Sequence, residues 1–115
     1  MYWVDLDPAA AGEQNKTRPC VVVSNNGANG AAHRLGRGVV TIAPISTRTQ
    51  FVAADFEVPI TTAEDLGAMG LTSTSKVQLN QVRTVSVDRL VRRSGRCRAE
   101  LLAEIDEALR FHLSL

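Results

Sequence analysis

Short apolar runs alternate with polar and glycine-containing segments along most of the chain. Their content of Val, Ile and aromatic residues favours strands at residues 1–6, 19–23, 39–45 and 56–60. The second run is almost entirely apolar, which is typical of a strand that is buried on both faces. Pro44 indicates an edge or a bulge near the end of the third strand, because proline cannot donate a hydrogen bond to a neighbouring strand.

Residues 75–85 also alternate between apolar and polar positions. Val82 breaks this alternation, which predicts a bulge or bend near residues 80–81. We expect a turn at residues 87–90, and Gly95 separates that turn from the last element.

Helical structure is expected in two places. Thr62 is a candidate N-cap for a short helical turn that ends at Leu66. A longer helix is expected over residues 98–113, where apolar residues recur at three- and four-residue steps. These residues are Leu101, Leu102, Ile105, Ala108, Leu109 and Leu113. His112 lies near this stripe, where a packed or half-exposed helix residue is favoured over a catalytic one.

Several short strands followed by one helix predict a mainly β fold. We expect a small, twisted antiparallel sheet that curls into a partly open barrel, with the C-terminal helix closing one side. The length of 115 residues fits one domain, which we place at residues 1–115.

The charge is split by region. The formal net charge is only +1, so no overall basic field indicates a nucleic-acid ligand. Residues 83–98, however, carry six arginines against one acid, Asp88. This distribution leaves room for a local basic face.

Nothing in the sequence indicates export, membrane insertion or a bound metal. The N-terminus lacks the charged and apolar regions of a signal peptide, and no apolar run is long enough to span a membrane. Cys20 and Cys97 lie far apart without a His/Cys cluster, and no nucleotide-binding fingerprint is present. We therefore expect a cytoplasmic protein with reduced cysteines and without a metal or cofactor.

The segment from Asp7 to Pro19 is a polar loop between two predicted strands, and a loop that is held by a rigid sheet often carries function. We place Arg18 at the mouth of the second strand, where its guanidinium suits a phosphate group. The loop also carries an acid, an amide, another cation and a hydroxyl, namely Glu13, Gln14, Lys16 and Thr17. The alternative interpretation is an exposed ion pair between Glu13 and one of the two cations.

Two further polar clusters lie at ends of predicted strands, at Ser46-Thr47-Arg48 and at residues 80–83. Together with the loop, they suggest cleavage of RNA by its own 2′-hydroxyl, a reaction that needs no metal or protein nucleophile and spares DNA. In this hypothesis Arg18 stabilises charge on a phosphoryl oxygen, and a hydroxyl of the first cluster donates a hydrogen bond to the same group. Glu13 accepts a proton or holds Arg18. The alternative is a set of polar strand ends without a catalytic role.

Motifs along essentially the whole chain bear on this choice. They are Trp3-Val4-Asp5-Leu6-Asp7-Pro8, Gly12-Glu13-Gln14, Lys16-Thr17-Arg18-Pro19, Ser24-Asn25, Ala43-Pro44-Ile45-Ser46, Gly70-Leu71 and Gln81-Val82-Arg83-Thr84-Val85. With these motifs the chain resembles the MazF/PemK toxins of bacterial toxin–antitoxin systems. The resemblance implies an SH3-like fold of the CcdB/MazF type, a homodimer, and a cognate antitoxin that blocks the RNA groove. It also implies a metal-independent mRNA interferase that cuts single-stranded RNA and leaves 2′,3′-cyclic phosphate and 5′-hydroxyl ends.

The same resemblance implies roles for individual residues. Arg18 matches the family's loop arginine, and Glu13 matches its loop glutamate, which is our candidate general base. Ser46 matches the family's hydroxyl residue, usually threonine, and Thr47 beside it is the alternative donor. Asn80 stands where many members have an aspartate, to which the PemK branch assigns a catalytic part. Because Asn80 cannot act as a base, a mechanism of arginine plus hydroxyl is favoured. The residues expected to contact RNA are Gln14, Lys16, Thr17, Arg34, Arg37, Arg48, Gln81 and Arg83.

Two other functional classes remain open. Relatives of the CcdB type poison DNA gyrase and end in Trp-Gly-Ile, whereas this chain ends in Leu113-Ser114-Leu115. A catalytically inactive module that binds RNA or an antitoxin is the other, and the departures at Ser46 and Asn80 keep it open.

Overall fold

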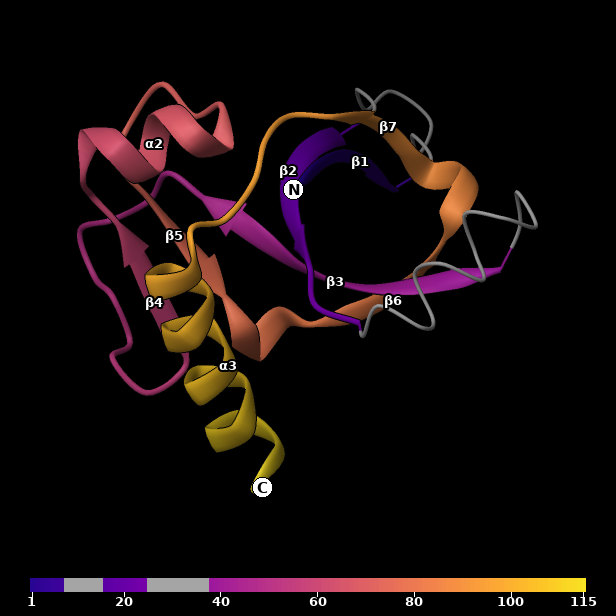
Figure 1. Cartoon of the computed structure of the whole chain (residues 1–115). Coiled ribbons are helices and arrows are strands. Elements are labelled where there is room, and N and C mark those ends of the chain that lie inside the picture. The colour runs from indigo at the N-terminus through magenta and orange to yellow at the C-terminus, as the bar shows by residue number, and fades with distance from the viewer. Residues whose placement is uncertain (8–15, 25–37) are drawn as a thin grey trace.

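The computed structural model describes residues 1–7, 16–24 and 38–115 (Figure 1). Within these residues the chain forms seven strands, two α-helices and two short 3-10 turns. The strands are β1 (Tyr2–Asp7), β2 (Lys16–Val22), β3 (Val39–Ser46), β4 (Glu57–Ile60), β5 (Ser75–Gln78), β6 (Arg83–Ser86) and β7 (Leu90–Arg93). The helices are α2 (Ala63–Met69) and α3 (Ala99–Leu113), and the 3-10 turns are η1 (Leu79–Gln81) and η2 (Val87–Arg89).

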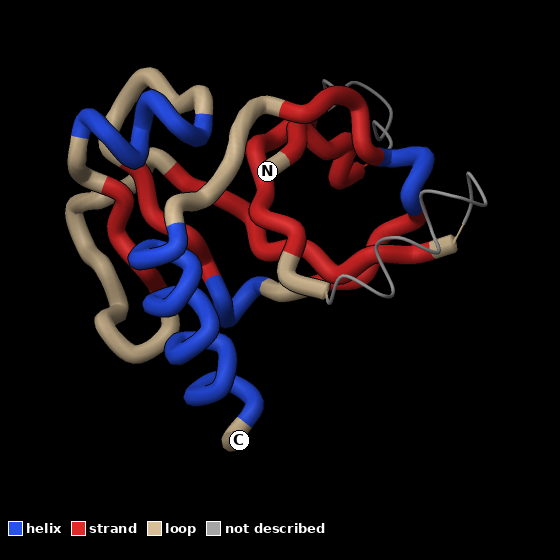
Figure 2. The backbone as a smooth tube through the Cα atoms, viewed as in Figure 1, coloured by secondary structure: helices blue, strands red, loops and turns tan. Residues whose placement is uncertain are grey.

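The strands form one antiparallel sheet in the order β4-β5-β3-β2-β1-β7, and β6 pairs with β3 beside this path. The sheet curls so that β1, β2, β3, β6 and β7 surround one side of the molecule, as Figures 1 and 2 show, while β4, β5 and both helices form the other. Among the described residues β6 and β7 do not pair with each other, so the ring of strands is open. The predicted fold, a curled and open β-sheet with a C-terminal helix, is confirmed.

Pro44 lies at the place where β3 changes partners. Along one edge of β3, β6 pairs as far as Ile42, and β5 begins to pair at Ile45. Proline is tolerated between the two ladders because no neighbouring strand there requires its missing N–H. The predicted bend between the two partner strands is η1, a 3-10 turn rather than a bulge.

Two hydrophobic cores lie on opposite faces of β3. Val40 and Ile42 belong to the core inside the β1, β2 and β6 strands, whereas Ala43 and Ile45 belong to the core beneath α2 and α3. Successive side chains of a strand point to opposite faces, so one strand can supply both cores. β3 is therefore the central strand that joins the two halves of the sheet.

The helices follow the predicted signals with one difference. Thr62 caps α2 as expected, although the helix continues past Leu66 to Met69. α3 buries Leu101, Ile105 and Ala108, as its periodicity predicts. Leu102 and Leu113 of the predicted stripe are instead 42% and 52% exposed.

Two further expectations need correction. The turn expected at residues 87–90 is present as η2 over Val87–Arg89, but Leu90 already belongs to β7, an unexpected strand that pairs with β1. Arg18 lies inside β2 rather than at its mouth, because β2 begins at Lys16. Pro19 is also inside β2, but it precedes Cys20, where pairing with β3 begins, so β2 has a neighbour on only one side there. A proline at such a position removes no bond to β3.

Candidate functional site

The register between β2 and β3 puts Arg18 and Ser46 on the same face of the sheet. The recorded pairs are Cys20 with Pro44, Val21 with Ala43 and Val22 with Ile42. Arg18 lies two residues before Cys20 and Ser46 lies two residues after Pro44, so both stand on the face that carries Cys20 and Pro44. Two residues that the sequence predicted from separate clusters thus share one face of the sheet.

Arg83 comes to the same region from β6. It pairs with Ile42 of β3, and its guanidinium Nη2 donates to the carbonyl oxygen of Leu6 at 3.2 Å. Ile42 and Ser46 are on the same face of β3 because they are separated by an even number of residues. Arg83 therefore approaches this face from the side opposite to β2.

The charges of Arg18 and Arg83 both affect the buried thiol of Cys20. Burial raises the pKa of Cys20 to about 12, and the positive charges of Arg18 and Arg83 act in the opposite direction. The thiol donates a hydrogen bond to the carbonyl oxygen of Arg18, with sulfur and oxygen 3.6 Å apart. Both guanidinium charges thus act on one side chain of the inner core, and both residues are exposed to solvent. A basic patch at this end of the sheet is suited to a phosphate group.

The hydroxyl cluster follows directly at the end of β3. The Ser46 hydroxyl accepts a hydrogen bond from the backbone N–H of Arg48 at 3.1 Å, which leaves its own proton available for donation. Ser46 is half-buried, whereas Thr47 and Arg48 are exposed. This arrangement favours Ser46 as the fixed hydroxyl.

A buried ion pair lies next to Ser46, and sequence reasoning missed it. Lys76 of β5 pairs with Ser46 in the sheet register, and its Nζ lies 3.0 Å from Oε1 of Glu57 on β4. Opposite charges on two neighbouring predicted strands were the available signal. The alternation of apolar and polar residues in the two strands places both side chains on a polar face. It does not show that another segment of the chain covers that face.

The remaining predicted residues fall into two groups. Thr17 is exposed on β2 and pairs with Asp5, Lys16 begins β2, and Gln81 is exposed in η1. The predicted site residues Glu13, Gln14, Arg34 and Arg37 lie outside the described residues. Asn80 is exposed in η1, at the start of the polar cluster of residues 80–83.

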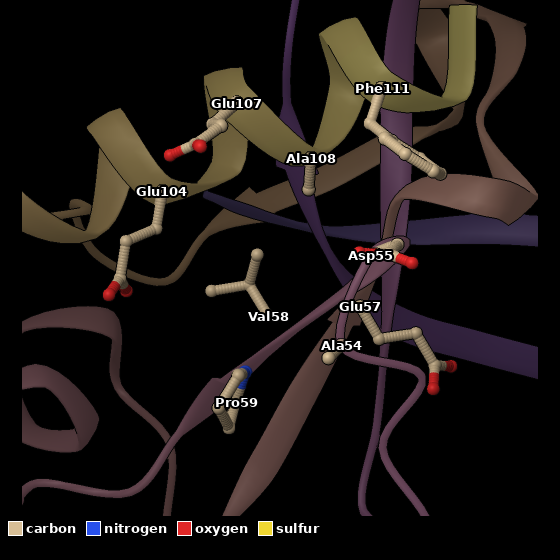
Figure 3. Close-up of a pocket in the computed structure, with 9 residues that line it drawn as sticks. All are labelled: Ala54, Asp55, Glu57, Val58, Pro59, Glu104, Glu107, Ala108 and Phe111. Carbon is tan, nitrogen blue, oxygen red and sulfur yellow. The ribbon is translucent and has the colours of Figure 1, made fainter.

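A separate hollow of about 290 Å³ lies between β4 and α3 (Figure 3). Val58, Pro59 and Ala108 supply apolar walls, and the carboxylates of Glu104 and Glu107 extend from the helix. None of the predicted site residues lines this hollow. Its acidic character makes it unsuited to RNA, whose backbone is an anion.

The described residues offer neither a metal site nor a membrane-spanning helix. No group of three or more His, Cys, Asp or Glu residues in this part of the chain is placed to hold a metal ion. Of the helices described, none is long and apolar enough to cross a membrane.

The fold and the polar strand ends define a class of toxin. Residues 1–113 match the family described as PemK-like, MazF-like toxin of type II toxin–antitoxin system, and the chain belongs to this family. The identification made from the sequence motifs is therefore confirmed.

Individual relatives are similar to this chain over nearly all of its length. The chain is 44% identical over 115 residues to Endoribonuclease MazF9 of Mycobacterium tuberculosis, an alignment that covers all of this chain and 93% of that protein. Its fold is similar to that of the Mycobacterium tuberculosis toxin MazF-mt6, with a TM-score of 0.74, 24% identity and coverage of 99% of this chain and 95% of the other. An endoribonuclease in complex with its cognate antitoxin, from a mycobacterial species, gives a TM-score of 0.71 at 22% identity, covering 99% and 90%.

Proposed function

We propose that this protein is the toxin of a toxin–antitoxin pair and acts as a sequence-specific, metal-independent endoribonuclease on single-stranded RNA. Membership of the toxin family and 44% identity to a protein named an endoribonuclease support the activity. The observation that carries the proposal is local. Arg18 and Ser46 stand on the same face of the neighbouring strands β2 and β3, and Arg83 reaches this face from β6, which supports a common site.

The proposed reaction uses the 2′-hydroxyl of the RNA as nucleophile. Its oxygen forms a bond to the adjacent phosphorus while the bond from phosphorus to the 5′-oxygen breaks. A base takes the 2′-proton, and the leaving 5′-oxygen receives a proton. The products are a 2′,3′-cyclic phosphate and a 5′-hydroxyl end. DNA lacks the 2′-hydroxyl and is not a substrate.

Each candidate residue has a role in this scheme. Arg18 stabilises the negative charge that grows on the phosphoryl oxygens, because a guanidinium forms two parallel hydrogen bonds to such a group. Ser46 donates a third hydrogen bond, with Thr47 as the alternative donor. Glu13 is the proposed base, since a guanidinium group stays protonated at neutral pH.

RNA binding uses the exposed polar residues around this centre. Arg83 and Arg48 contribute positive charge from β6 and from the segment after β3, and this attraction is independent of sequence. The other proposed contacts are Gln14, Lys16, Thr17, Arg34, Arg37 and Gln81. In this proposal residues 1–115 act as one toxin domain in a cytoplasmic homodimer, and a cognate antitoxin blocks the RNA groove.

End mapping of the reaction products tests the proposal. Purified protein is incubated with a mixed-sequence RNA in the presence of EDTA, and cut ends are identified by their reactivity towards polynucleotide kinase. We expect discrete cuts whose 5′ ends accept phosphate without prior phosphatase treatment. Uncut RNA with tight antitoxin binding would instead indicate an inactive binding module. Uncut RNA with stalled DNA gyrase would indicate a gyrase poison.

A further inference from the structure

The ion pair between Lys76 and Glu57 is unusual because both side chains are buried. Lys76 is 8% exposed and Glu57 is 6% exposed, and the ammonium nitrogen lies 3.0 Å from the carboxylate oxygen Oε1. Removing two charges from water is costly, and their attraction offsets that cost only where further hydrogen bonds satisfy both groups. The other contacts of this pair therefore show what holds it in place.

Those contacts reach the segment between β3 and β4. Lys76 Nζ donates to the backbone carbonyl of Phe51 at 2.8 Å, and the backbone N–H of Ala53 donates to Glu57 Oε1 at 2.9 Å. Gln78 Nε2 donates to the second carboxylate oxygen at 3.3 Å. Figure 3 shows the Glu57 carboxylate pointing away from α3, although the residue also borders the hollow beneath that helix. The ion pair is therefore bound to the segment between β3 and β4 and does not point towards α3.

The same segment begins at the candidate hydroxyl. Ser46 is the last residue of β3 and pairs with Lys76 of β5, so the two side chains stand on the same face of the sheet. From Ser46 the chain passes through Thr47 and Arg48 and returns to the ion pair at Phe51 and Ala53. One end of this stretch therefore pairs with Lys76 through the sheet backbone, and the other end is bound by the side chains of the ion pair.

The hydrogen bonds also keep the carboxylate ionised. Burial by itself raises the pKa of Glu57, but hydrogen bonds from Ala53, Lys76 and Gln78 outweigh it and hold the pKa below its usual value of 4.5. The folded-state pKa is the lower one, so the stabilisation is present above pH 4.5 and is lost as the pH falls through the folded value. The ion pair between Glu57 and Lys76 is therefore intact at the neutral pH of an RNA-cleavage assay.

We propose that Glu57 and Lys76 are positioning residues for RNA cleavage. Their buried ion pair holds residues 46–53 against β5 so that the Ser46 or Thr47 hydroxyl keeps its position relative to Arg18. Neither residue touches the RNA. The inference rests on the proposed ribonuclease function, because it assigns a role within that same site.

Single-turnover cleavage and amide hydrogen exchange test this role in the full-length protein. In Lys76→Met and Glu57→Gln, we expect faster exchange in peptides covering residues 47–56 and unchanged exchange in β1. The cleavage rate constant should fall about tenfold to a hundredfold, the scale seen when a catalytic group is displaced by about an ångström. The RNA concentration at half-maximal rate should change less than threefold. Lys76→Arg keeps the cation and its donors and should restore most of the rate.

Arg98→Met is the matched control. It removes the ion pairs that Arg98 forms with Glu64 and Asp65 across α2 and α3, away from the segment after Ser46. Its cleavage rate should stay within twofold of wild type even if its melting temperature falls. Lys76→Met and Glu57→Gln should also lose no more together than the worse of the two alone, because each breaks the same pair.

The outcomes separate the two levels of the proposal. Faster exchange at residues 47–56 with unchanged cleavage overturns the positioning role, as does lost cleavage with unchanged exchange. If Lys76→Met does not fold, Lys76→Arg and Glu57→Gln decide the question by the same two readouts. Wild-type protein that leaves RNA uncut overturns the proposed function itself, whereas active wild type with equally active variants overturns only the role of the ion pair.

Discussion

Truncating Arg18 to alanine should reduce the rate of RNA cleavage and leave the stability of the fold nearly unchanged. Arg18 is exposed, and its side chain forms no hydrogen bond or ion pair with another described residue. Its backbone pairs with Val4 of β1 and accepts the Cys20 thiol, and both contacts survive the substitution. Surface changes of this kind alter the free energy of unfolding by no more than about 0.5 kcal/mol. The variant should therefore melt at nearly the wild-type temperature.

The expected loss of activity is much larger than the loss of stability. Removal of one preorganised donor to a developing oxyanion costs about 10²–10³ in kcat, or about 2.7–4 kcal/mol of transition-state stabilisation. The exposure of Arg18 places it towards the lower end of that range, because water weakens its field. We expect Arg18→Ala to cleave about a hundredfold more slowly or worse. Arg18→Lys should be intermediate, since lysine keeps the charge but lacks the planar fork.

Single-turnover cleavage of a mixed-sequence RNA in EDTA measures this effect, and fluorescence anisotropy measures RNA affinity separately. Arg110→Ala on the last turn of α3 is the matched control, because it removes an equally exposed arginine far along the chain from the site. Its rate should equal that of the wild type. An Arg18→Ala protein that melts normally and cleaves within threefold of wild type would refute the assignment of Arg18 to transition-state charge.

Three further predictions address the hydroxyl, the buried thiol and a close backbone contact. Ser46→Ala should slow single-turnover cleavage more than Thr47→Ala, because the Ser46 hydroxyl is held by a backbone N–H, and the reverse order would assign the hydroxyl to Thr47. In folded protein at pH 8, iodoacetamide should alkylate Cys97 before Cys20, because Cys20 is fully buried and its pKa is raised to about 12; equal labelling by mass spectrometry would contradict this. Gly95→Ala should lower the free energy of unfolding by about 1–3 kcal/mol in urea melts, because a Cβ there would meet the backbone at the end of α2. Gly67→Ala, in open space within α2, should instead raise it by about 0.5–1 kcal/mol, and equal effects of the two changes would show that the close contact is not present in solution.

Most elements could be predicted because their signals are local. The apolar runs at residues 1–6, 39–45 and 56–60 became strands, and the stripe at 98–113 became α3. β7 was missed for a physical reason. Leu90–Arg93 is an exposed edge strand in which apolar and polar residues do not alternate. It forms a strand only because the edge of β1 that faces away from β2 pairs with it.

The candidate site was predictable only in part. Arg18, Ser46 and Arg83 were identified by residue type and by family motifs, but no local pattern brings three separate strands to one end of a sheet. The buried Glu57 and Lys76 could not be identified as buried at all. Their strands alternate normally, and burial of the polar face depends on a separate segment crossing it.

The amino-acid sequence by itself determined most of the strands, the C-terminal helix and the family to which the chain belongs. These follow from residue types and spacings between near neighbours. The tertiary structure alone decided which polar residues share a face. That outcome depends on the β2–β3 register, the exchange of β6 for β5 at Pro44, and the return of residues 51–53 to Lys76. These pairings join residues far apart in the chain, and their energies come from burial and hydrogen bonds that exist only after the sheet has curled around its two cores.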